Sequence, residues 1–367
     1  MTKPIASDAQ LFKKTLQRYK TLIDEDIAEY SKYARRVTLQ QYGADARLET
    51  DAFLDVLSRG GKRIRGALVM LGYEMSGGTD LRMIVQAARA LEMIHAHMLI
   101  VDDIQDRSRT RRGGPAAHVA LADYHRQQRL AGDPEHFGMA VAINSGISGT
   151  YAAQNILAGL DADPQLCLNV LGIVGQTVIT TAHGQTCDIM NEVVADVSAE
   201  SIRNVLEWKS AQYTVLNPLC VGMVLAGADC AATDAIRDYA LGTGMAFQVS
   251  DDILSTFGAE FESGKSPMDD IREGKRTLMV AYALEHVSTA DQNYLLEVLG
   301  DARLTPAQFE RARAIMDSCG ALDYARAEMK RYIDTALQSL ERESARWTDD
   351  GVRFLRHLAT YMLTRRS

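Results

Sequence analysis

The chain has 367 residues, of which 47% are hydrophobic and 24% charged, and a net charge of −8. It is long enough to bury a large core, and its negative charge argues against nucleic acid as the main partner. Few prolines, few alternating apolar–polar runs and no linker-like stretch predict one large, mostly helical domain.

The first segment, residues 1–40, has alternating charges and predicts a surface helix or extension, which leaves residues 41–367 as the main domain. It contains no apolar segment of the signal-peptide kind. The five cysteines are odd in number and form no CxxC pair, which is typical of free thiols in a reducing compartment. We therefore expect a cytoplasmic protein.

Residues 58–66 read SRGGKRIRG and precede an apolar run at residues 67–71, so we expect a helix to begin here. The backbone N–H groups at a helix start favour anions, and Lys62, Arg63 and Arg65 add positive charge at the same place. A basic surface loop is the alternative, but the position between a glycine pair and a buried helix predicts an anion site.

The next predicted helix, residues 80–105, ends in an acidic cluster, Asp102, Asp103 and Asp106. Residues four apart on a helix share a face, with Cβ atoms about 5–6 Å apart. Two carboxylates so placed suit Mg²⁺, which binds oxygen ligands and keeps waters or substrate phosphates. A solvated acidic helix end is the alternative, yet the preceding residues 98–101 are apolar and indicate a buried helix.

Positive charge surrounds this acidic cluster. Arg109, Arg111 and Arg112 follow it before a Gly-Gly-Pro stop, and His95 lies two turns before Asp102. Arginine binds phosphate oxygens in a fork geometry. Arginines beside aspartates of the metal-binding kind predict a metal-chelated anion such as a diphosphate.

Two central stretches, residues 136–160 and 164–187, have no acidic, lysine or arginine side chain and are long enough to span a bilayer. Both contain repeated Asn, Gln, Ser, Thr and Gly. We therefore expect buried helices of a soluble bundle and no transmembrane segment. Directly after the second stretch, Asp188 needs a partner, because burying a lone carboxylate is costly.

Farther on, Lys209 and Ser210 precede an apolar run, where a lysine could simply extend from a helix end to solvent. A second acidic cluster follows in FQVSDDILS at residues 247–255, with Gln248 one turn before Asp252. The Gly/Pro/Lys-rich residues 264–277 then predict a mobile lid, and residues 309–316, 322–340 and 351–364 predict helices that only pack. We expect the two acidic clusters to face one another across one metal–diphosphate site.

The ordered motifs GGKRIR, DDIQD followed by RR, GQTCD, KS, FQVSDD and DIREGKRT resemble those of the trans-isoprenyl diphosphate synthases, the polyprenyl synthetase family, over residues 58–283. The resemblance implies an all-α bundle around a deep central cavity, usually a homodimer. It also implies a Mg²⁺-dependent prenyltransferase that ionises an allylic diphosphate. The double bond of isopentenyl diphosphate then attacks the carbocation, and a proton passes to the departing diphosphate.

The resemblance also implies roles for individual residues. Three Mg²⁺ ions would bind at Asp102, Asp103, Asp106 and Asp251. The allylic diphosphate would contact Arg111, Lys209, Lys265 and Lys275. Isopentenyl diphosphate would contact Lys62, Arg65, His95 and Arg112. Ser210 and Gln248 would face the developing cation.

Product length in such an enzyme depends on what blocks the cavity above the first acidic cluster. A helical turn rises about 5.4 Å, roughly one isoprene unit, and the positions one turn before Asp102 are His97 and Met98. Neither is a small residue, which argues against very long products, and neither is a Phe, which argues against the tight stop of farnesyl-forming members. We expect a C20 product, with C15 as the alternative.

One departure from the family pattern opens a second interpretation. Ser255 replaces the last aspartate of the second motif, which brings the segment close to the metal motif of class I terpene cyclases. The glutamate of that motif would fall at Ala259, one position from Glu260. In the cyclase interpretation, the residues of the isopentenyl diphosphate site would have no ligand. A partner subunit of a heteromeric synthase is the other alternative, but such subunits tend to lose aspartates that this chain keeps.

Overall fold

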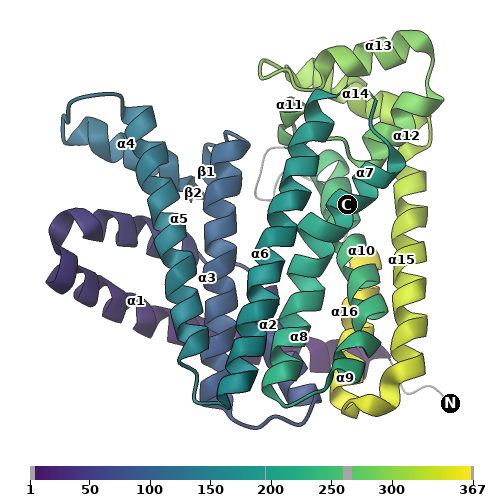
Figure 1. Cartoon of the computed structure of the whole chain (residues 1–367). Helices are drawn as coiled ribbons and strands as arrows, with labels where there is room; N and C mark the ends of the chain where they lie inside the picture. Colours follow the sequence, from purple (N-terminus) through teal and green to yellow (C-terminus); the bar gives the residue numbers. More distant parts are fainter. Residues whose placement is uncertain (1–4, 195, 259–266, 365–367) are drawn as a thin grey trace. The chain divides into compact units, whose positions relative to one another are not determined.

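The computed structural model of the chain describes residues 5–194, 196–258 and 267–364, with the side chains of residues 8–363 among them (Figure 1). In these ranges the only β-structure is one hairpin of two-residue strands, and all other regular elements are helices. The all-α fold class predicted from the sequence is therefore confirmed.

The chain forms two compact units. The N-terminal unit comprises Lys13–Gly172 and Pro218–Ala228, and the C-terminal unit comprises Met1–Phe12, Ile173–Asn217 and Asp229–Ser367. Helix α6 (Pro164–Val193) begins in the first unit and continues in the second. The domain boundary expected near residue 40 stays a prediction.

The N-terminal unit is built around α3, the helix that ends in the first acidic cluster. The Asp80 side chain caps α3 by accepting a 3.0 Å hydrogen bond from the Met83 N–H, so the helix begins where the sequence predicted. Helix α1 departs from helical geometry at Gly43, where φ is 86°. The elements of this unit are most of α1 (Ile5–Ser58), whose start up to Phe12 belongs to the C-terminal unit, α2 (Ile64–Met75), α3 (Leu81–Gln105), β1 (Thr110–Arg111), β2 (Gly114–Pro115), α4 (Ala117–Gln127), α5 (Pro134–Ala158) and, from Pro218 on, α8 (Asn217–Leu225).

The C-terminal unit is built around α10, which carries the second acidic cluster and packs against η1 and α15. The Tyr239 hydroxyl on α10 donates a 2.8 Å hydrogen bond to the Leu355 carbonyl, which ties α10 to α16. Besides α6, its elements are α7 (Ala199–Asn204), η1 (Val205–Leu216), α9 (Cys230–Ala235), α10 (Arg237–Phe257), α11 (Asp269–Glu273), α12 (Leu278–His286), α13 (Thr289–Val298), α14 (Pro306–Ser318), α15 (Ala321–Glu343), η2 (Ser344–Arg346) and α16 (Asp349–Thr364).

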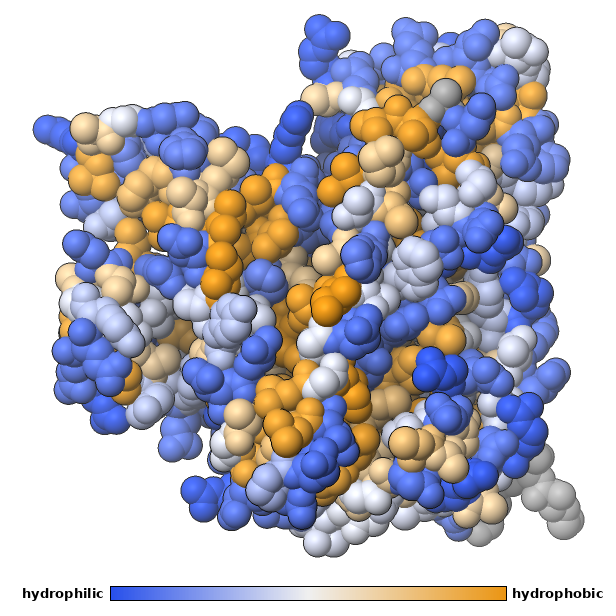
Figure 2. Space-filling view, viewed as in Figure 1, coloured by the Kyte–Doolittle hydropathy of each residue, from blue (hydrophilic) through white to orange (hydrophobic). Residues whose placement is uncertain are grey.

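Small residues on α5 allow it to pack closely against its neighbours. A Cβ added at Gly149 would lie 2.1 Å from the Phe53 ring, and one at Gly146 would lie 2.6 Å from His97 Nδ1 on α3. Most of the large apolar residues of α5 therefore point the other way, although Leu157 is fully buried. Met139, Ile143, Ile147 and Tyr151, spaced four apart, are 37–62% exposed, and Figure 2 shows hydrophobic side chains gathered over this helix.

Two described helices are long and apolar enough to cross a membrane by length and composition, α3 and α6. The most apolar window of α3 is 67% buried within the protein, as in a core helix, whereas that of α6 is 28% buried. The expectation that residues 136–160 and 164–187 form wholly buried helices is thus wrong for their outer faces. The cause is that their small and polar residues, not their large apolar ones, make the inward contacts.

Candidate active site

The loop that precedes α2 requires glycine. Gly60 and Gly61 have φ values of 83° and 120°, a region that side chains with a Cβ rarely adopt. Arg63 also has a positive φ of 51°, at the N-cap of α2. Such a conformation is unfavourable for an arginine and persists only where its surroundings hold it.

Arg63 is held by a buried network. Its guanidinium donates to Asp24 at 2.8 Å, to the Leu57 carbonyl at 2.8 Å and to Glu92 at 3.4 Å, and its side chain is 2% exposed. Glu92 also accepts the backbone N–H of Gly66 at 2.9 Å. Arg63 therefore neutralises buried carboxylates and anchors the loop, and its charge is not available to an anion as the sequence analysis expected.

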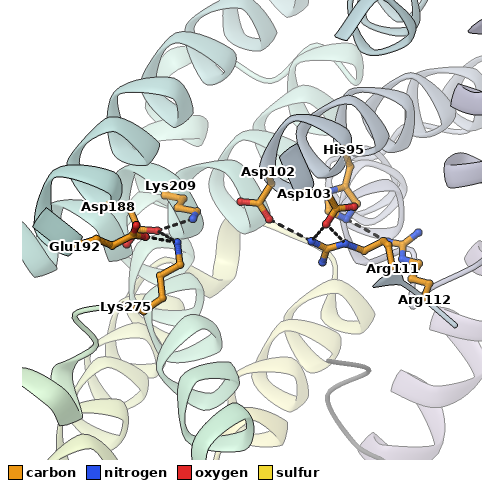
Figure 3. A network of polar contacts seen from close by, with 9 residues as sticks. All are labelled: His95, Asp102, Asp103, Arg111, Arg112, Asp188, Glu192, Lys209 and Lys275. Atoms are coloured by element: carbon orange, nitrogen blue, oxygen red, sulfur yellow. Dashed lines mark hydrogen bonds and ion pairs between the residues drawn. The ribbon is translucent and has the colours of Figure 1, made fainter. Parts of the chain in front are cut away.

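Three of the predicted isopentenyl residues meet in the N-terminal unit. Arg65 approaches Nε2 of His95 at 3.3 Å. Arg112 approaches the same nitrogen at 3.3 Å (Figure 3). Since arginine has donors only, this nitrogen accepts and the imidazole is neutral. Burial, followed by the charges of Arg65 and Arg112, lowers the pKa of His95 well below its ordinary value. The predicted fourth member, Lys62, lies exposed in the same loop.

This cluster has an excess of positive charge. Burial and the neighbouring guanidinium groups of Arg63, Arg111 and Arg65 lower the pKa of Arg112, although Glu92 opposes the shift. Like charges so close together are unfavourable unless an anion balances them. The arrangement therefore fits a bound diphosphate.

The first acidic cluster is joined to Arg111. Arg111 Nε donates to Asp103 at 2.8 Å, and its Nη2 pairs with Asp103 again and with Asp102 at 3.3 Å (Figure 3). Asp103 is 1% exposed, whereas Asp102 is partly exposed and Asp106 caps the end of α3. Asp103 thus orients Arg111, and Asp102 and Asp106 occupy one helix face as the spacing predicted.

In the C-terminal unit, Asp188 on α6 joins two predicted lysines. Its Oδ2 lies 2.7 Å from Lys209 Nζ and 3.2 Å from Lys275 Nζ, and Lys275 also contacts Glu192 at 2.7 Å (Figure 3). Burial alone would raise the pKa of Asp188, but the two ammonium groups outweigh it and lower the pKa below its usual range. The partner that the sequence analysis required for Asp188 is therefore a pair of lysines.

Glycines make these contacts possible. A Cβ at Gly184 on α6 would lie 2.5 Å from the backbone nitrogen of Lys209, and one at Gly244 on α10 would lie 2.5 Å from the Cα of Ala211. Both contacts are to η1, a twelve-residue π-helix at Val205–Leu216. Wide helices of this kind are rare and occur mostly at functional sites.

A hydrogen-bonded chain joins the KS motif to the second acidic cluster. The Ser210 hydroxyl donates to Gln248 Oε1 at 2.7 Å, and Gln248 Nε2 donates to Asp252 at 2.8 Å. Ser255, the departure from the family pattern, donates to the Asp252 carbonyl at 3.0 Å and to the carboxylate of Asp270. Ser255 thus replaces the carboxylate of the family pattern, and a carboxylate from α11, that of Asp270, lies next to it.

Burial and then the charge of Asp270 raise the pKa of Asp252 well above its ordinary value, with Asp251 and Asp188 adding to the shift. Carboxylates that repel one another in this way are favourable sites for a divalent cation. Within the described ranges no three His, Cys, Asp or Glu side chains already converge on one point. The donors fit Mg²⁺, which is commonly bound by one or two carboxylates with substrate phosphates completing its shell.

Lys265 lies outside the described residues, as do Ala259 and Glu260 of the cyclase interpretation. Two residues at the site escaped the sequence analysis. Glu192 is four residues after Asp188, a helical spacing that could have revealed it, whereas Asp270 is brought to Ser255 only by the fold.

Residues 47–316 match the model of a known family, polyprenyl synthetase. The chain belongs to the polyprenyl synthetase family. It is 29% identical to geranylgeranyl diphosphate synthase of Saccharolobus solfataricus, over 86% of this chain and 90% of that protein. It is 30% identical to geranylfarnesyl diphosphate synthase of Aeropyrum pernix, over 80% of this chain and 87% of that protein.

A solved structure of the family is also similar. Geranylgeranyl pyrophosphate synthase from Corynebacterium glutamicum, complexed with isoprenyl diphosphate and magnesium, matches with a TM-score of 0.90 and 30% identity over 96% of this chain and 99% of that one. The family resemblance drawn from the ordered motifs is therefore confirmed.

Proposed function

We propose that this protein is a trans-prenyltransferase that condenses isopentenyl diphosphate with an allylic diphosphate and releases a C20 prenyl diphosphate. The observation that carries this proposal is the pairing of a neutral His95 with Arg65 and Arg112 in a polyprenyl synthetase chain. A terpene cyclase, which consumes no isopentenyl diphosphate, would have no ligand for this cluster.

Isopentenyl diphosphate binds at this cluster in our proposal. Arg65 and Arg112 present guanidinium groups to its phosphates, and Lys62 adds a third charge from the exposed loop. His95 accepts from both arginines, so it holds their planes in place without adding a charge. The ligand relieves the repulsion that lowers the pKa of Arg112.

The allylic diphosphate is the ligand of the second set of cations, Arg111, Lys209, Lys275 and, by family resemblance, Lys265. In the present structure Arg111 is bound to Asp103 and Asp102, and both described lysines are bound to Asp188. In our proposal these carboxylates orient the cationic groups for the leaving diphosphate, which gains negative charge. Such preorganised charges are the main means of stabilising a heterolytic bond cleavage.

Mg²⁺ is the proposed cofactor, with three ions bound together with the allylic substrate. Asp102 and Asp106 would hold two of them, with Asp103 in support, and Asp251 would hold the third. When bound, these ions neutralise the diphosphate and make it a better leaving group. The protein's own contribution is a set of carboxylates fixed on two rigid helices, α3 and α10.

In our proposal Ser210 and Gln248 face the carbocation. The Ser210 hydroxyl donates a hydrogen bond to Gln248, so the lone pairs of the hydroxyl oxygen remain available to positive charge. Neither residue is a strong base, and the proton lost from the adduct passes to the departing diphosphate. Because Ser255 is joined to Asp270, the second motif keeps acidic character despite its altered last position.

We also propose that the enzyme is a homodimer in the cytoplasm. The exposed stripe of α5, Met139, Ile143, Ile147 and Tyr151, would be covered by a second copy and not by lipid. All five cysteines are free thiols, which agrees with a reducing compartment.

The proposed reaction is tested by incubating the protein with Mg²⁺, radiolabelled isopentenyl diphosphate and allylic primers of different length. We expect label in a C20 prenyl diphosphate, with little product beyond it. A hydrocarbon or alcohol formed from the primer alone would instead identify a cyclase. Absence of product unless a second chain is added would identify a partner subunit.

A further inference from the structure

Arg59 has no part in either proposed diphosphate site and lies between α1 and the loop at Gly60 and Gly61 that precedes α2, the glycine loop. Its Nη1 donates to the backbone carbonyls of Pro115 at 2.6 Å and Arg111 at 3.1 Å. Its Nη2 pairs with Asp55, one turn earlier on α1, and its side chain is only 15% exposed. One guanidinium thus binds both strands of the β1–β2 hairpin.

This hairpin carries the arginines of both proposed diphosphate sites, and it has little support of its own. Its strands have two residues each, paired Thr110 with Pro115 and Arg111 with Gly114. A hairpin this short is not stable in isolation. The position of Arg111 and Arg112 therefore depends on contacts from outside the hairpin.

Hydrogen bonds join the hairpin and the glycine loop, with donors on both sides. Arg112 Nη1 donates to the Gly60 carbonyl at 2.6 Å, and its guanidinium lies over Gly61, where an added Cβ would be 3.2 Å from Arg112 Cζ. Arg59 makes the opposite connection from the loop to the hairpin. Gly114 leaves room for it, because a Cβ there would lie 2.6 Å from Arg59 Nη1.

We propose that Arg59 is a positioning residue that fixes the hairpin so that Arg111 and Arg112 face their two diphosphates. The identity of these ligands rests on the proposed function. The Arg59 guanidinium is engaged by two backbone carbonyls and by Asp55, so its proposed role is to position other residues. Its effect is on affinity, because a displaced guanidinium loses its fork geometry toward phosphate.

The test replaces Arg59 with methionine, which keeps the apolar part of the side chain and removes the donors. We expect isopentenyl diphosphate, titrated calorimetrically without Mg²⁺, to bind roughly tenfold more weakly or worse, because small displacements of binding groups cost this much. The Tm should stay near that of the wild type. Arg59→Lys should recover part of the affinity, since an ammonium can still donate to a carbonyl.

A matched control is Arg126→Met on α4 of the same unit, where Arg126 forms exposed ion pairs with Asp123 and Glu135. It should leave affinity unchanged. A second control uses the contact at Gly114. Gly114→Ala displaces the Arg59 guanidinium, so it should weaken binding as Arg59→Met does, and the double variant should lose no more than either single one.

Hydrogen exchange of residues 110–115 separates this inference from the proposed function. Faster exchange in the hairpin of Arg59→Met, at unchanged Tm, would support the positioning role whether or not the wild type binds isopentenyl diphosphate. A wild type that does not bind isopentenyl diphosphate would overturn only the proposed function. Wild-type exchange in the hairpin, or affinity losses that simply add in the double variant, would overturn the role of Arg59.

Discussion

Buried charges at single residues decide which side chains can serve a substrate. Arg63 pairs with Asp24 and Glu92, whereas Arg65 and Arg112, two and forty-nine positions farther along the chain, both approach the neutral His95. The first arrangement neutralises buried carboxylates. In the second, burial and the neighbouring guanidinium groups lower the pKa of Arg112, a shift that a bound anion would oppose. Residues of one type within one motif therefore have different roles.

The depressed pKa of His95 predicts a loss of stability in acid. Above an ordinary histidine pKa of about 6.5 both folded and unfolded states are neutral. As pH falls below it, the unfolded state binds a proton first, so the free energy of unfolding drops by up to about 1.4 kcal/mol per pH unit until the folded-state pKa is reached. His97 and His118, whose pKa values are also lowered, contribute in the same direction.

Urea unfolding at a series of pH values measures this slope. His95→Gln keeps an acceptor for Arg65 and Arg112 but cannot titrate, so its stability should fall less steeply than the wild type's below pH 6.5. At pH 8 the two proteins differ only in hydrogen bonding. The free energy of unfolding of each protein at pH 8 is therefore the reference for its own values at lower pH. Identical slopes would contradict a depressed pKa at His95.

At the residue scale the sequence predicted the identity of most charged groups but not their pairings. The spacing of Asp102 and Asp106 and the cationic loop at Lys62–Arg65 could be interpreted because they are local patterns. The inward orientation of the Arg63 side chain could not be predicted, since it depends on Asp24 and Glu92 from two other helices. The link between Ser255 and Asp270 depends in the same way on tertiary structure.

At the scale of elements, we propose that a growing prenyl chain would extend along α3 and α5. Met98 lies one turn before Asp102 on the same face of α3, and His97 fits against Gly146 of α5. Both side chains are only partly buried. These two positions are therefore the ones expected to limit product length.

Replacing either residue by alanine should lengthen the product, because it removes bulk one helical turn above the diphosphate site. Thin-layer chromatography of labelled products measures the shift, with Arg82→Ala at the exposed start of α3 as the control. The wild-type chain length in both His97→Ala and Met98→Ala would remove this explanation of product length.

Element boundaries were well predicted where capping signals were present. The helix predicted at residues 80–105 begins beside Asp80, whose side chain accepts a hydrogen bond from the first turn. The two uncharged central helices were interpreted less well. Apolar content indicated burial, but the small residues of α5 took the inward positions and left its large ones outside.

At the scale of the molecule, the α5 stripe predicts association. Ile143→Lys combined with Ile147→Lys places two charges in an apolar surface and should convert a dimer into a monomer, as measured by sedimentation equilibrium. Leu130→Lys, an equally exposed apolar residue beyond α4, should leave the dimer intact. A dimeric double variant, or a monomeric wild type, would contradict the proposed interface.

The division into two compact units could not be predicted, because no linker or change of composition marks it. Each unit carries one acidic cluster and its own cationic partners. In the proposed function, both clusters bind the same magnesium-chelated allylic diphosphate, and this proposal is the one most in need of a test.

The most direct test is calorimetric titration of a non-hydrolysable allylic diphosphate analogue into the wild type, Asp102→Asn and Asp251→Asn, each with Mg²⁺ and with EDTA. We expect tight binding only by the wild type with Mg²⁺, and losses of at least about tenfold in each variant, as for removal of a metal-binding group. Binding that is indifferent to Mg²⁺, or that survives one of the two substitutions unchanged, would contradict the claim.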